Sequence, residues 1–350
     1  MTRGPGHDLG LHRVVSPEGA LPQAAQKLDA SEGIFANEVA IEVETLNVDS
    51  ASFGQIVGDV GADESAVAAR IEGIVLERGK MQNPVTGSGG MLLGRVAEVG
   101  PDYSGPVQLK TGDPVATLVS LTLTPLKLQE IREVHLEADQ VDVRGMAYLW
   151  PSSPLVVLPE DLDHRVALAA LDVCGAPAQT ERLVQGARSL VILGAGKSGM
   201  LCACAARTFG DEDLKIYGLD RDKEGLHMLR EAGLFDGVAG VDATRPVEVL
   251  EAVEKLTGGE AVDVVINTCN VPGTEMSAIL PTRQGGTVYF FNMATDFSRA
   301  ALGCEGVGRD VQLLIGNGFV QGHAECTLDL VRRHRLVRER LSAIVGAPLT

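Results

Sequence analysis

The first half of the chain alternates apolar and polar residues in the manner of β-strands. Between residues 37 and 44, valine and isoleucine occupy one face and glutamate mostly the other, which predicts a half-buried strand. Residues 63–78 instead place apolar side chains at helical spacing, with Asp63 or Ser65 as the expected cap. This half is therefore predicted to be mostly β, with further strands at residues 94–99 and 114–123.

From about Leu162 the pattern changes to short strands that alternate with helices. Such an alternation with crossover helices predicts a parallel, doubly wound sheet. The predicted strands are residues 189–193, 215–219, 262–267, 286–292 and 311–315. The predicted helices are residues 165–183 (interrupted near Gly175 and Pro177), 200–208, 223–232, 246–256, 274–280 and 324–336.

A glycine-rich turn joins one predicted strand to the next helix. Gly194, Gly196 and Gly199 form a G-x-G-x-x-G pattern directly after the apolar run of residues 189–193. The first glycine allows a tight turn, the second lets the backbone approach a pyrophosphate, and the third lets helix and strand pack closely. The helix N-terminus then favours the negative charge. We therefore expect a dinucleotide site formed by Gly194, Ala195, Gly196, Lys197, Ser198 and Gly199.

An acidic residue ends the following strand. Asp220 lies about 20 residues after Gly199, where a carboxylate can bind ribose hydroxyls. Its charge would repel a 2′-phosphate and so favours NAD, whereas the adjacent Arg221 leaves NADP possible. Ligands of open α/β sheets bind beyond the carboxyl ends of the strands. We expect that rim to contain Gly194, Asp220, Asn267, Thr268, Asn292 and Gly316.

Composition narrows the class of protein. The 350 residues suit two domains, and the formal net charge of −17 argues against nucleic acid and anionic membranes as partners. No apolar run is long enough to span a bilayer, and residues 1–10 show no apolar signal core. The six cysteines form no C-x-x-C pair, so buried thiols in a reducing compartment are expected. Together these features predict a soluble cytoplasmic protein.

Two motifs in the β-rich half resemble a known superfamily. Residues 94–100 and 110–115 are similar to the G-x-V-x-x-V-G and x-x-G-D-x-V patterns of medium-chain dehydrogenases/reductases. The resemblance implies a β-rich GroES-like catalytic domain plus a Rossmann domain, an α/β architecture. The catalytic domain is expected at residues 1–160 and 317–350, and the Rossmann domain at residues 161–316. It also implies at least a homodimer, joined edge to edge through residues 311–315.

Four further segments resemble a narrower family. Residues 10–14, 21–25, 80–91 and 316–318 are similar to L-erythro-3,5-diaminohexanoate dehydrogenases. The resemblance implies reversible oxidative deamination of a small diamino acid, in which the 3-amino group becomes a ketone, ammonia leaves, and NAD or NADP takes the hydride. Two alternatives stay open: a zinc-independent quinone or enone reductase of the same superfamily, and a non-catalytic dinucleotide-binding protein.

The zinc ligands of related alcohol dehydrogenases are mostly missing. Residues 46–53 contain no cysteine, and residues 87–90 read Gly-Ser-Gly-Gly where the superfamily has Gly-His-Glu. Only the third ligand position looks occupied, by Cys174. Catalytic zinc needs three protein ligands, so we expect no metal. Absence of a metal suits an amine, because hydride loss leaves an iminium whose positive charge a metal cation would oppose.

The residues that replace the zinc site are the candidates for catalysis. The reaction needs a general base for the substrate ammonium, carboxylates near the second ammonium and a cation for the substrate carboxylate. Asp49 and Asp172 are candidates for base or ammonium partner, and Arg13, Lys80 and Arg95 for the carboxylate. The expected pocket also includes Ser50, Ser52, Ser88 and Cys174, with Gln82, Asn83 and Thr86 touching substrate.

Overall fold

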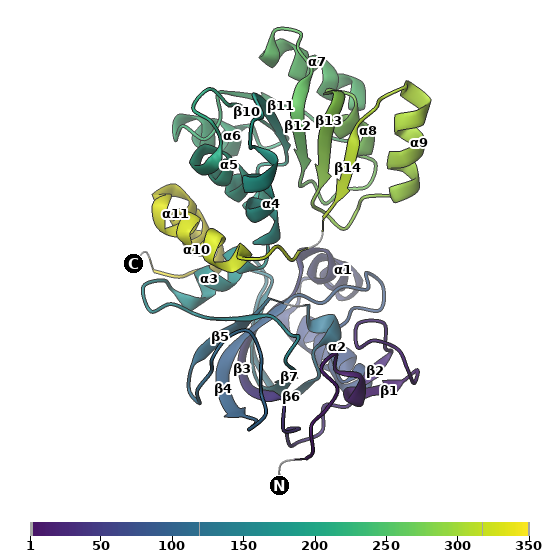
Figure 1. Ribbon diagram of the computed structural model, residues 1–350, viewed down its shortest axis with the longest axis vertical. Coiled ribbons are helices and arrows are strands. Elements are labelled where there is room, and N and C mark those ends of the chain that lie inside the picture. The colour runs from purple at the N-terminus through teal and green to yellow at the C-terminus, as the bar shows by residue number, and fades with distance from the viewer. Residues whose placement is uncertain (1–2, 119, 317, 349–350) are drawn as a thin grey trace. The chain divides into compact units, whose positions relative to one another are not determined.

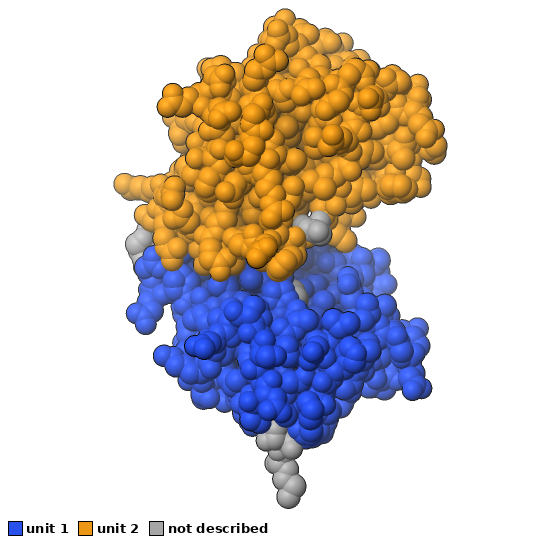
Figure 2. Space-filling view, in the orientation of Figure 1, with its two compact units in different colours: residues 1–172, 340–350 blue, residues 173–339 orange. Residues whose placement is uncertain are grey.

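The chain divides into two compact units, which are coloured separately in Figure 2. The structure is a computed structural model that describes residues 3–118, 120–316 and 318–348. Unit 1 comprises Met1–Asp172 and Arg340–Thr350, and unit 2 comprises Val173–Glu339. The predicted domain boundaries, after residues 160 and 316, stay a prediction.

Unit 1 is built on a six-stranded antiparallel sheet in the order β6-β7-β3-β4-β5-β8 (Figure 1). The strands are β3 (Val39–Asn47), β4 (Met91–Val99), β5 (Pro114–Thr117), β6 (Leu126–His135), β7 (Gln140–Leu149) and β8 (Leu155–Val157). A separate small pair is formed by β1 (Val14–Ser16) and β2 (Lys27–Leu28). The alternation predicted for residues 37–44 is confirmed in β3, whose valine and isoleucine side chains are buried.

Helices α1 and α2 contribute to the apolar core of unit 1. Phe53 and Ile56 of α1 and Ile71 of α2 are buried among the apolar residues of the sheet. The predicted cap is confirmed, since the Asp63 carboxylate accepts the Ala66 N–H. Strand β5 ends earlier than predicted, at Thr117. The helical segments of unit 1 are η1 (Leu11–Arg13), α1 (Ser50–Val60), α2 (Glu64–Arg78), η2 (Leu121–Leu123) and α3 (His164–Leu171).

Unit 2 contains a six-stranded parallel sheet in the order β11-β10-β9-β12-β13-β14. This is the strand order of the doubly wound dinucleotide-binding fold, in which the first strand pairs with the second and fourth. The predicted parallel sheet is therefore confirmed. The strands are β9 (Ser189–Leu193), β10 (Lys215–Asp220), β11 (Gly237–Gly240), β12 (Val262–Asn267), β13 (Thr282–Phe290) and β14 (Gln312–Ile315).

The helices of unit 2 connect these strands (Figure 1). The helix predicted over residues 165–183, with an interruption near Gly175 and Pro177, is two helices, and the interruption at residues 172–174 directly precedes Gly175. Pro177 lies in the first turn of the second helix, where no backbone donor is needed. The helices are α4 (Gly175–Leu183), α5 (Lys197–Phe209), α6 (Lys223–Glu231), α7 (Pro246–Thr257), α8 (Glu275–Ile279), α9 (Phe297–Val307), α10 (His323–Arg333) and α11 (Arg335–Val345), which continues into unit 1. None of the helices formed by described residues is long and apolar enough to cross a bilayer.

Candidate functional site

The glycine turn between β9 and α5 has the geometry that a pyrophosphate needs. Gly194 has a φ of +90°, and a Cβ there would lie 2.7 Å from Thr268 Oγ1. A Cβ on Gly199 would collide with the Gly194 carbonyl oxygen, so this glycine lets α5 begin close to β9. A Cβ on Gly196 would meet nothing within 4 Å. Open space therefore lies beside the first turn of α5, whose N-terminus favours an anion.

Asp220 lies directly against this turn. Its Oδ2 accepts the Ala195 N–H at 2.6 Å, and its Oδ1 accepts the Asp222 N–H at 2.9 Å. Each carboxylate oxygen has a further acceptor position, which leaves capacity for ribose hydroxyls. The structure thus brings Asp220 to the glycine turn, as the sequence predicts, and also gives it a role in holding the turn. The neighbouring Arg221 is exposed.

The polar residues at the carboxyl ends of the strands shape the surrounding loops. Asn267 is buried, and its Nδ2 donates to Thr274 Oγ1 at 2.8 Å. Thr268 Oγ1 donates to the Gly194 carbonyl at 3.0 Å, and Asn292 Nδ2 donates to the Asn267 carbonyl at 3.3 Å. These side chains lie at the predicted rim, but their hydrogen bonds stabilise its loops. Direct contact with a cofactor stays a prediction for them.

The remaining predicted cofactor residues also lie at the carboxyl edge of the sheet. Lys197 and Ser198 open α5 and are half-buried. Gly316 follows β14, is exposed, and donates its N–H to the Phe290 carbonyl at 2.8 Å. Asn317, part of a segment that resembles the narrower family, lies outside the described residues.

In unit 1, the loop over residues 81–90 is tied to α1. Asn83 is fully buried and donates from Nδ2 to Gln55 Oε1 at 2.7 Å and to the Ser52 carbonyl at 3.3 Å. The hydroxyls of Ser52 and Thr86 share a hydrogen bond of 2.5 Å. The structure therefore brings together Ser52, Asn83 and Thr86, which the sequence predicts to line one pocket.

Gln82 and Ser88 lie at the two ends of the same loop. Gln82 Oε1 accepts a hydrogen bond from Arg78 Nη1 at 3.0 Å, and its Nε2 donates to the Gly87 carbonyl at 3.3 Å. Ser88 is half-buried, and its N–H donates to Thr86 Oγ1 at 3.3 Å. These contacts close the loop on itself and hold its polar side chains beside α1.

Asp49 is the candidate residue with the most distinctive environment. It caps α1, because its Oδ1 accepts the Ser52 N–H at 3.0 Å. Its Oδ2 is buried and has no hydrogen-bond partner. Gly90 packs on this backbone, and a Cβ there would lie 2.8 Å from the Asp49 nitrogen. A buried carboxylate oxygen without a donor is costly, so this position suits a ligand that brings a cationic donor.

Asp172 and Cys174 lie at the ends of two helices. Asp172 follows α3 and is half-buried in unit 1, whereas Cys174 precedes α4 and is buried in unit 2. The Cys174 carbonyl accepts a hydrogen bond from Thr327 Oγ1 at 3.4 Å. All six cysteines are free thiols, of which Cys174, Cys202 and Cys204 are buried. Burial raises the pKa of the Cys202 thiol to about 12, which makes it a poor nucleophile.

Arg13 is committed to a buried ion pair rather than to a substrate. Its Nε and Nη2 donate to the two oxygens of Glu38 at 2.9 and 2.6 Å, and both side chains are fully buried. The alternation of residues 37–44 predicts Glu38 on the polar, solvated face of the strand. This prediction is wrong for Glu38, because the ion pair with Arg13 holds it in the interior. Burial opposes its ionisation, but hydrogen bonds from Arg13 and His12 lower the pKa of Glu38 to about 2.

The two other predicted carboxylate-binding cations also have structural partners. Lys80 is fully buried, and its Nζ donates to the carbonyls of Pro22 and Gln23 at 2.9 and 3.2 Å. Burial lowers the pKa of Lys80 to about 8. Arg95 pairs with Glu44 at 2.9 Å on the exposed side of the sheet. Neither contact leaves an evident cation for a substrate carboxylate.

Arg165 is a further cation of unit 1 with an unusual environment, and the sequence patterns do not single it out. It lies in the first turn of α3, and its Nε donates to Gln140 Oε1 at 3.0 Å. Its Nη2 is buried without a hydrogen-bond partner. A signal exists in the sequence, because a cation in the first turn of a helix opposes the helix dipole and so needs another reason to be there.

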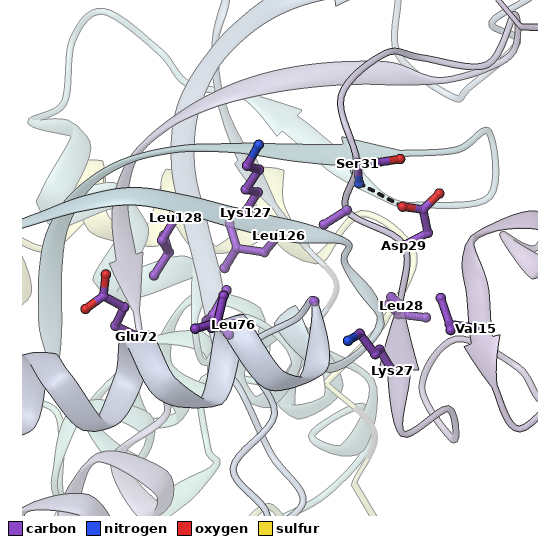
Figure 3. Close-up of a pocket in the computed structure, with 13 residues that line it drawn as sticks. Val15, Lys27, Leu28, Asp29, Ser31, Glu72, Leu76, Leu126, Lys127 and Leu128 are labelled. Carbon is purple, nitrogen blue, oxygen red and sulfur yellow. Dashed lines mark hydrogen bonds between the residues drawn. The ribbon is translucent and has the colours of Figure 1, made fainter.

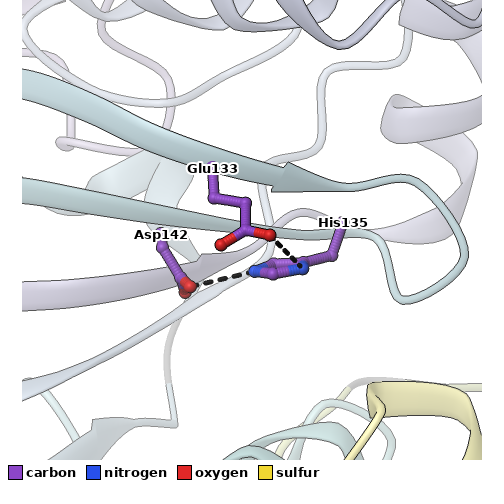
Figure 4. Close-up of side chains that lie close together, drawn as sticks. All are labelled: Glu133, His135 and Asp142. Atoms are coloured by element: carbon purple, nitrogen blue, oxygen red, sulfur yellow. Dashed lines mark hydrogen bonds and ion pairs between the residues drawn. The ribbon is translucent and has the colours of Figure 1, made fainter.

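One group of His and carboxylate side chains in the described part of the chain has the spacing of metal ligands (Figure 4). His135 lies between Asp142, at 2.9 Å from its Nε2, and Glu133, at 3.9 Å from its Nδ1. Asp142 also accepts the Thr45 hydroxyl and lies 3.9 Å from Arg165 Nη1. The nearby guanidinium opposes a further cation, so these contacts describe an ion-paired cluster on the sheet.

A pocket of about 340 Å³ lies elsewhere in unit 1 (Figure 3). In it, Leu76 of α2 points toward Leu126 and Leu128 of β6, and Lys27 and Glu72 add charge. It is lined by none of the residues that the sequence singles out for chemistry.

Comparison with known proteins identifies relatives over nearly the whole chain. The family model described as the L-erythro-3,5-diaminohexanoate dehydrogenase N-terminal domain matches residues 12–159. The enzyme of that name from Acetoanaerobium sticklandii is 51% identical, over 95% of this chain and 97% of the relative. The one from Fusobacterium nucleatum is 49% identical, over 97% and 99%.

Solved structures support the fold. An alcohol dehydrogenase from Thermotoga maritima is similar with a TM-score of 0.57 at 16% identity, covering 89% of this chain and 86% of that chain. The CurK enoyl reductase gives 0.55 at 18%, covering 91% and 82%. These likenesses confirm the predicted medium-chain dehydrogenase/reductase architecture, whereas the two full-length relatives are far closer in sequence. The chain therefore belongs to the L-erythro-3,5-diaminohexanoate dehydrogenase family.

Proposed function

We propose that this chain catalyses the NAD(P)-dependent oxidative deamination of (3S,5S)-3,5-diaminohexanoate to 5-amino-3-oxohexanoate and ammonia, a step of lysine fermentation. Two relatives support this reaction by their names, and each shares about half of its residues with this chain over nearly the full length. The same relatives favour it over the two alternatives, quinone or enone reduction and binding without catalysis.

The observation that carries the proposal in this chain is the unpartnered carboxylate oxygen of Asp49. An alcohol or enone substrate offers no cation to such a group, whereas a diamino acid offers two ammonium groups. We assign Asp49 as ammonium partner or general base, and Ser52, Ser88, Asp172 and Cys174 stay candidates for catalysis. Gln82, Asn83 and Thr86 are proposed to contact the substrate.

The reaction sets clear tasks for the chain's own residues. A carboxylate must take a proton from the substrate ammonium, because only the neutral amine can release a hydride from its carbon. The pocket must then admit one water, which adds to the iminium before ammonia leaves. A bound nicotinamide dinucleotide would accept the hydride. The glycine turn and the N-terminus of α5 fit its pyrophosphate, and Asp220 fits its ribose.

NAD is the proposed cofactor, with NADP tolerated. Both oxygens of Asp220 face backbone N–H groups of the turn and of the segment after β10. A ribose 2′-hydroxyl can donate to this carboxylate, whereas a 2′-phosphate would meet its negative charge. Arg221 is exposed beside Asp220, and its positive charge could pair with a 2′-phosphate, so the site would also accept NADP.

We also propose that the reaction runs without zinc. Of the three ligand positions of related zinc enzymes, the sequence supplies a thiol at only one, Cys174. Asp49 lies near another of these positions, but one of its carboxylate oxygens accepts the Ser52 N–H and caps α1. A single thiolate ligand without a histidine does not hold a catalytic zinc ion, which needs three protein ligands. The residues present therefore fit a bound ammonium better than a metal.

A homodimer in the cytoplasm is proposed as the working form. Strand β14 lies at one edge of the unit 2 sheet and has no strand on its outer side among the described residues. Phe297 and Leu302 of the neighbouring helix α9 are 68% and 65% exposed. An uncovered edge with large apolar side chains beside it suits pairing with a second copy.

The proposed function is tested by a direct comparison of donors. Purified protein is given 3,5-diaminohexanoate with NAD or with NADP at alkaline pH, and separately an enone with NADPH, while absorbance at the nicotinamide band is followed. We expect amine-dependent reduction of NAD, slower reduction of NADP, and no loss of NADPH with the enone. Enone-dependent oxidation without amine turnover would support the reductase alternative instead.

A further inference from the structure

Arg165 carries a guanidinium that the fold anchors on one side only. Its Nε donates to Gln140 Oε1 at 3.0 Å, and its Nη1 lies 3.9 Å from Asp142 Oδ2. The remaining nitrogen, Nη2, is buried and donates to nothing. A buried charged donor without an acceptor costs free energy, so the position is better explained by a ligand than by stability.

The anchoring contacts place Arg165 at the end of the sheet where Asp49 begins α1. Gln140 pairs with Asn47 across β7 and β3, and its Nε2 donates to Asn47 Oδ1 at 3.2 Å. Asp49 follows two residues after Asn47. The chain between them is held as well, because the Val48 N–H donates to the carbonyl of Asp139, which precedes Gln140. The unit 1 residues Arg165 and Asp49 are thus linked through one short hydrogen-bonded path.

Two opposite charges, each with one buried atom that has no hydrogen-bond partner, therefore lie at one end of a single sheet. A diamino acid carries a carboxylate at one end and ammonium groups along its chain, so it offers a partner to each of these charges. An arginine fork is well suited to a carboxylate, and a carboxylate to an ammonium.

We propose that Arg165 binds the carboxylate of the diamino acid substrate through Nη2, while Asp49 Oδ2 binds an ammonium group. This inference rests on the proposed function. It adds Arg165 as the residue that makes the enzyme prefer a substrate with a carboxylate over one without. Gln140 is a positioning residue in it, because it holds the guanidinium without facing the substrate.

Four other cations of unit 1 have partners in the fold. Arg13 is paired with Glu38, and Lys80 is bound to two backbone carbonyls. Arg78 donates to Gln82, and Arg144 pairs with Glu130 at 3.3 Å on the exposed sheet face. Arg165 differs from these four in having a buried nitrogen that lacks an acceptor.

The test compares the acid with its neutral carboxamide. Values of kcat/KM for 3,5-diaminohexanoate and 3,5-diaminohexanamide are measured with wild type, Arg165→Gln and the surface control Arg144→Gln. A charge-assisted hydrogen bond is worth about one to two powers of ten in kcat/KM, so wild type and Arg144→Gln should prefer the acid by ~10- to 100-fold. Arg165→Gln should turn over acid and amide at similar rates, with amide turnover close to that of wild type.

The outcomes separate this inference from the function on which it rests. If Arg165→Gln slows acid and amide by the same factor, Arg165 has only a structural role and the inference is wrong. If that variant does not fold, Arg165→Met, which also removes the positive charge, provides the same comparison, and an acid preference equal to that of wild type would overturn the inference. Wild type that oxidises neither compound would instead defeat the proposed function.

Discussion

At the scale of single residues, Asp49 performs two tasks with two oxygens. One oxygen accepts the Ser52 N–H and caps α1, and the other is buried without a partner. Capping alone needs only the first, as Asp63 demonstrates at the start of α2, where its side chain accepts the Ala66 N–H at 2.9 Å. The second oxygen of Asp49 is therefore the part of the residue that helix stability does not explain.

Replacing Asp49 by asparagine separates these two tasks. Asparagine caps helices about as well as aspartate, so the free energy of unfolding should change by less than ~1 kcal/mol. Loss of the negative charge should lower kcat/KM for the diamino acid by roughly 10- to 100-fold, because the ammonium loses a charge-assisted hydrogen bond. Urea unfolding and steady-state kinetics measure the two effects.

The matched control is Asp63→Asn, which alters a cap of the same kind on the next helix. This variant should keep wild-type kinetics within about twofold, as expected for an exposed substitution far from any proposed contact. Full activity in Asp49→Asn, or an equal loss in both variants, would show that Asp49 only caps α1.

The sequence identified Asp49 as a candidate but not the feature that distinguishes its environment. The sequence pointed to Asp49 because this residue lies in the segment where related enzymes have a zinc ligand. Only the fold showed that one of its carboxylate oxygens has no hydrogen-bond partner. Arg165 was missed because its hydrogen-bond partner Gln140 lies 25 residues earlier in the chain, so their contact is not visible in the sequence. Asn83 and Thr86 were predicted because the loop that carries them is unusual in composition, and their contact with substrate stays a prediction.

At the scale of elements, the ion pair of Arg13 and Glu38 joins η1 to the start of β3. Arg13 also donates to the carbonyls of Ser31 and Gly33 at 3.2 and 2.9 Å, so one buried guanidinium holds the whole segment between them. Such an ion pair is costly to break, because removal of one partner leaves a buried charge.

This ion pair predicts a loss of stability in acid. The pKa of Glu38 is about 2, below its ordinary value of 4.5, so its contribution is complete above pH 4.5 and is lost as the pH falls toward 2. A shift of that size corresponds to about 3 kcal/mol in the free energy of unfolding. Urea unfolding from pH 7 to pH 3 should show that Glu38→Gln is about 3 kcal/mol less stable at pH 7 and less sensitive to acid than wild type. Parallel pH profiles would contradict this assignment.

Element prediction succeeded where the pattern was strong and local. The strands β9 and β12 have the predicted bounds, because each is a short apolar run bordered by polar residues. Helix α1 was not predicted, since Gly54 and Gly58 weaken its helical propensity and packing against α2 and the sheet supplies its stability. Strands β6 and β7 were missed as well, because charged residues on the solvent face of β6 hide the alternation.

At the scale of the whole molecule, the sequence established a β-rich part and a parallel α/β part, but the strand order became visible only in the structure. Order determines which strand lies at an edge, and β14 is such an edge in unit 2. The dimer expected from the superfamily resemblance can therefore be tested at a defined place.

Negative charges introduced on the exposed face of α9 should prevent the proposed homodimer from forming. The double variant Phe297→Glu and Leu302→Glu alters exposed side chains, so it should fold normally and run as a monomer in light scattering where wild type is a dimer. Leu76→Glu on α2, also at an exposed apolar position, is the control and should stay dimeric. A double variant that remains dimeric would place the interface elsewhere.

Oxidation of the amine can be tested by following the hydride itself. With 3,5-diaminohexanoate deuterated at carbon 3, NAD and an excess of chelator, we expect NADH that carries deuterium on the nicotinamide ring and one ammonia for each NADH. Both products should form at the same rate with and without chelator. NADH without deuterium, or activity that chelator abolishes and zinc restores, would contradict a metal-free oxidation of the amine.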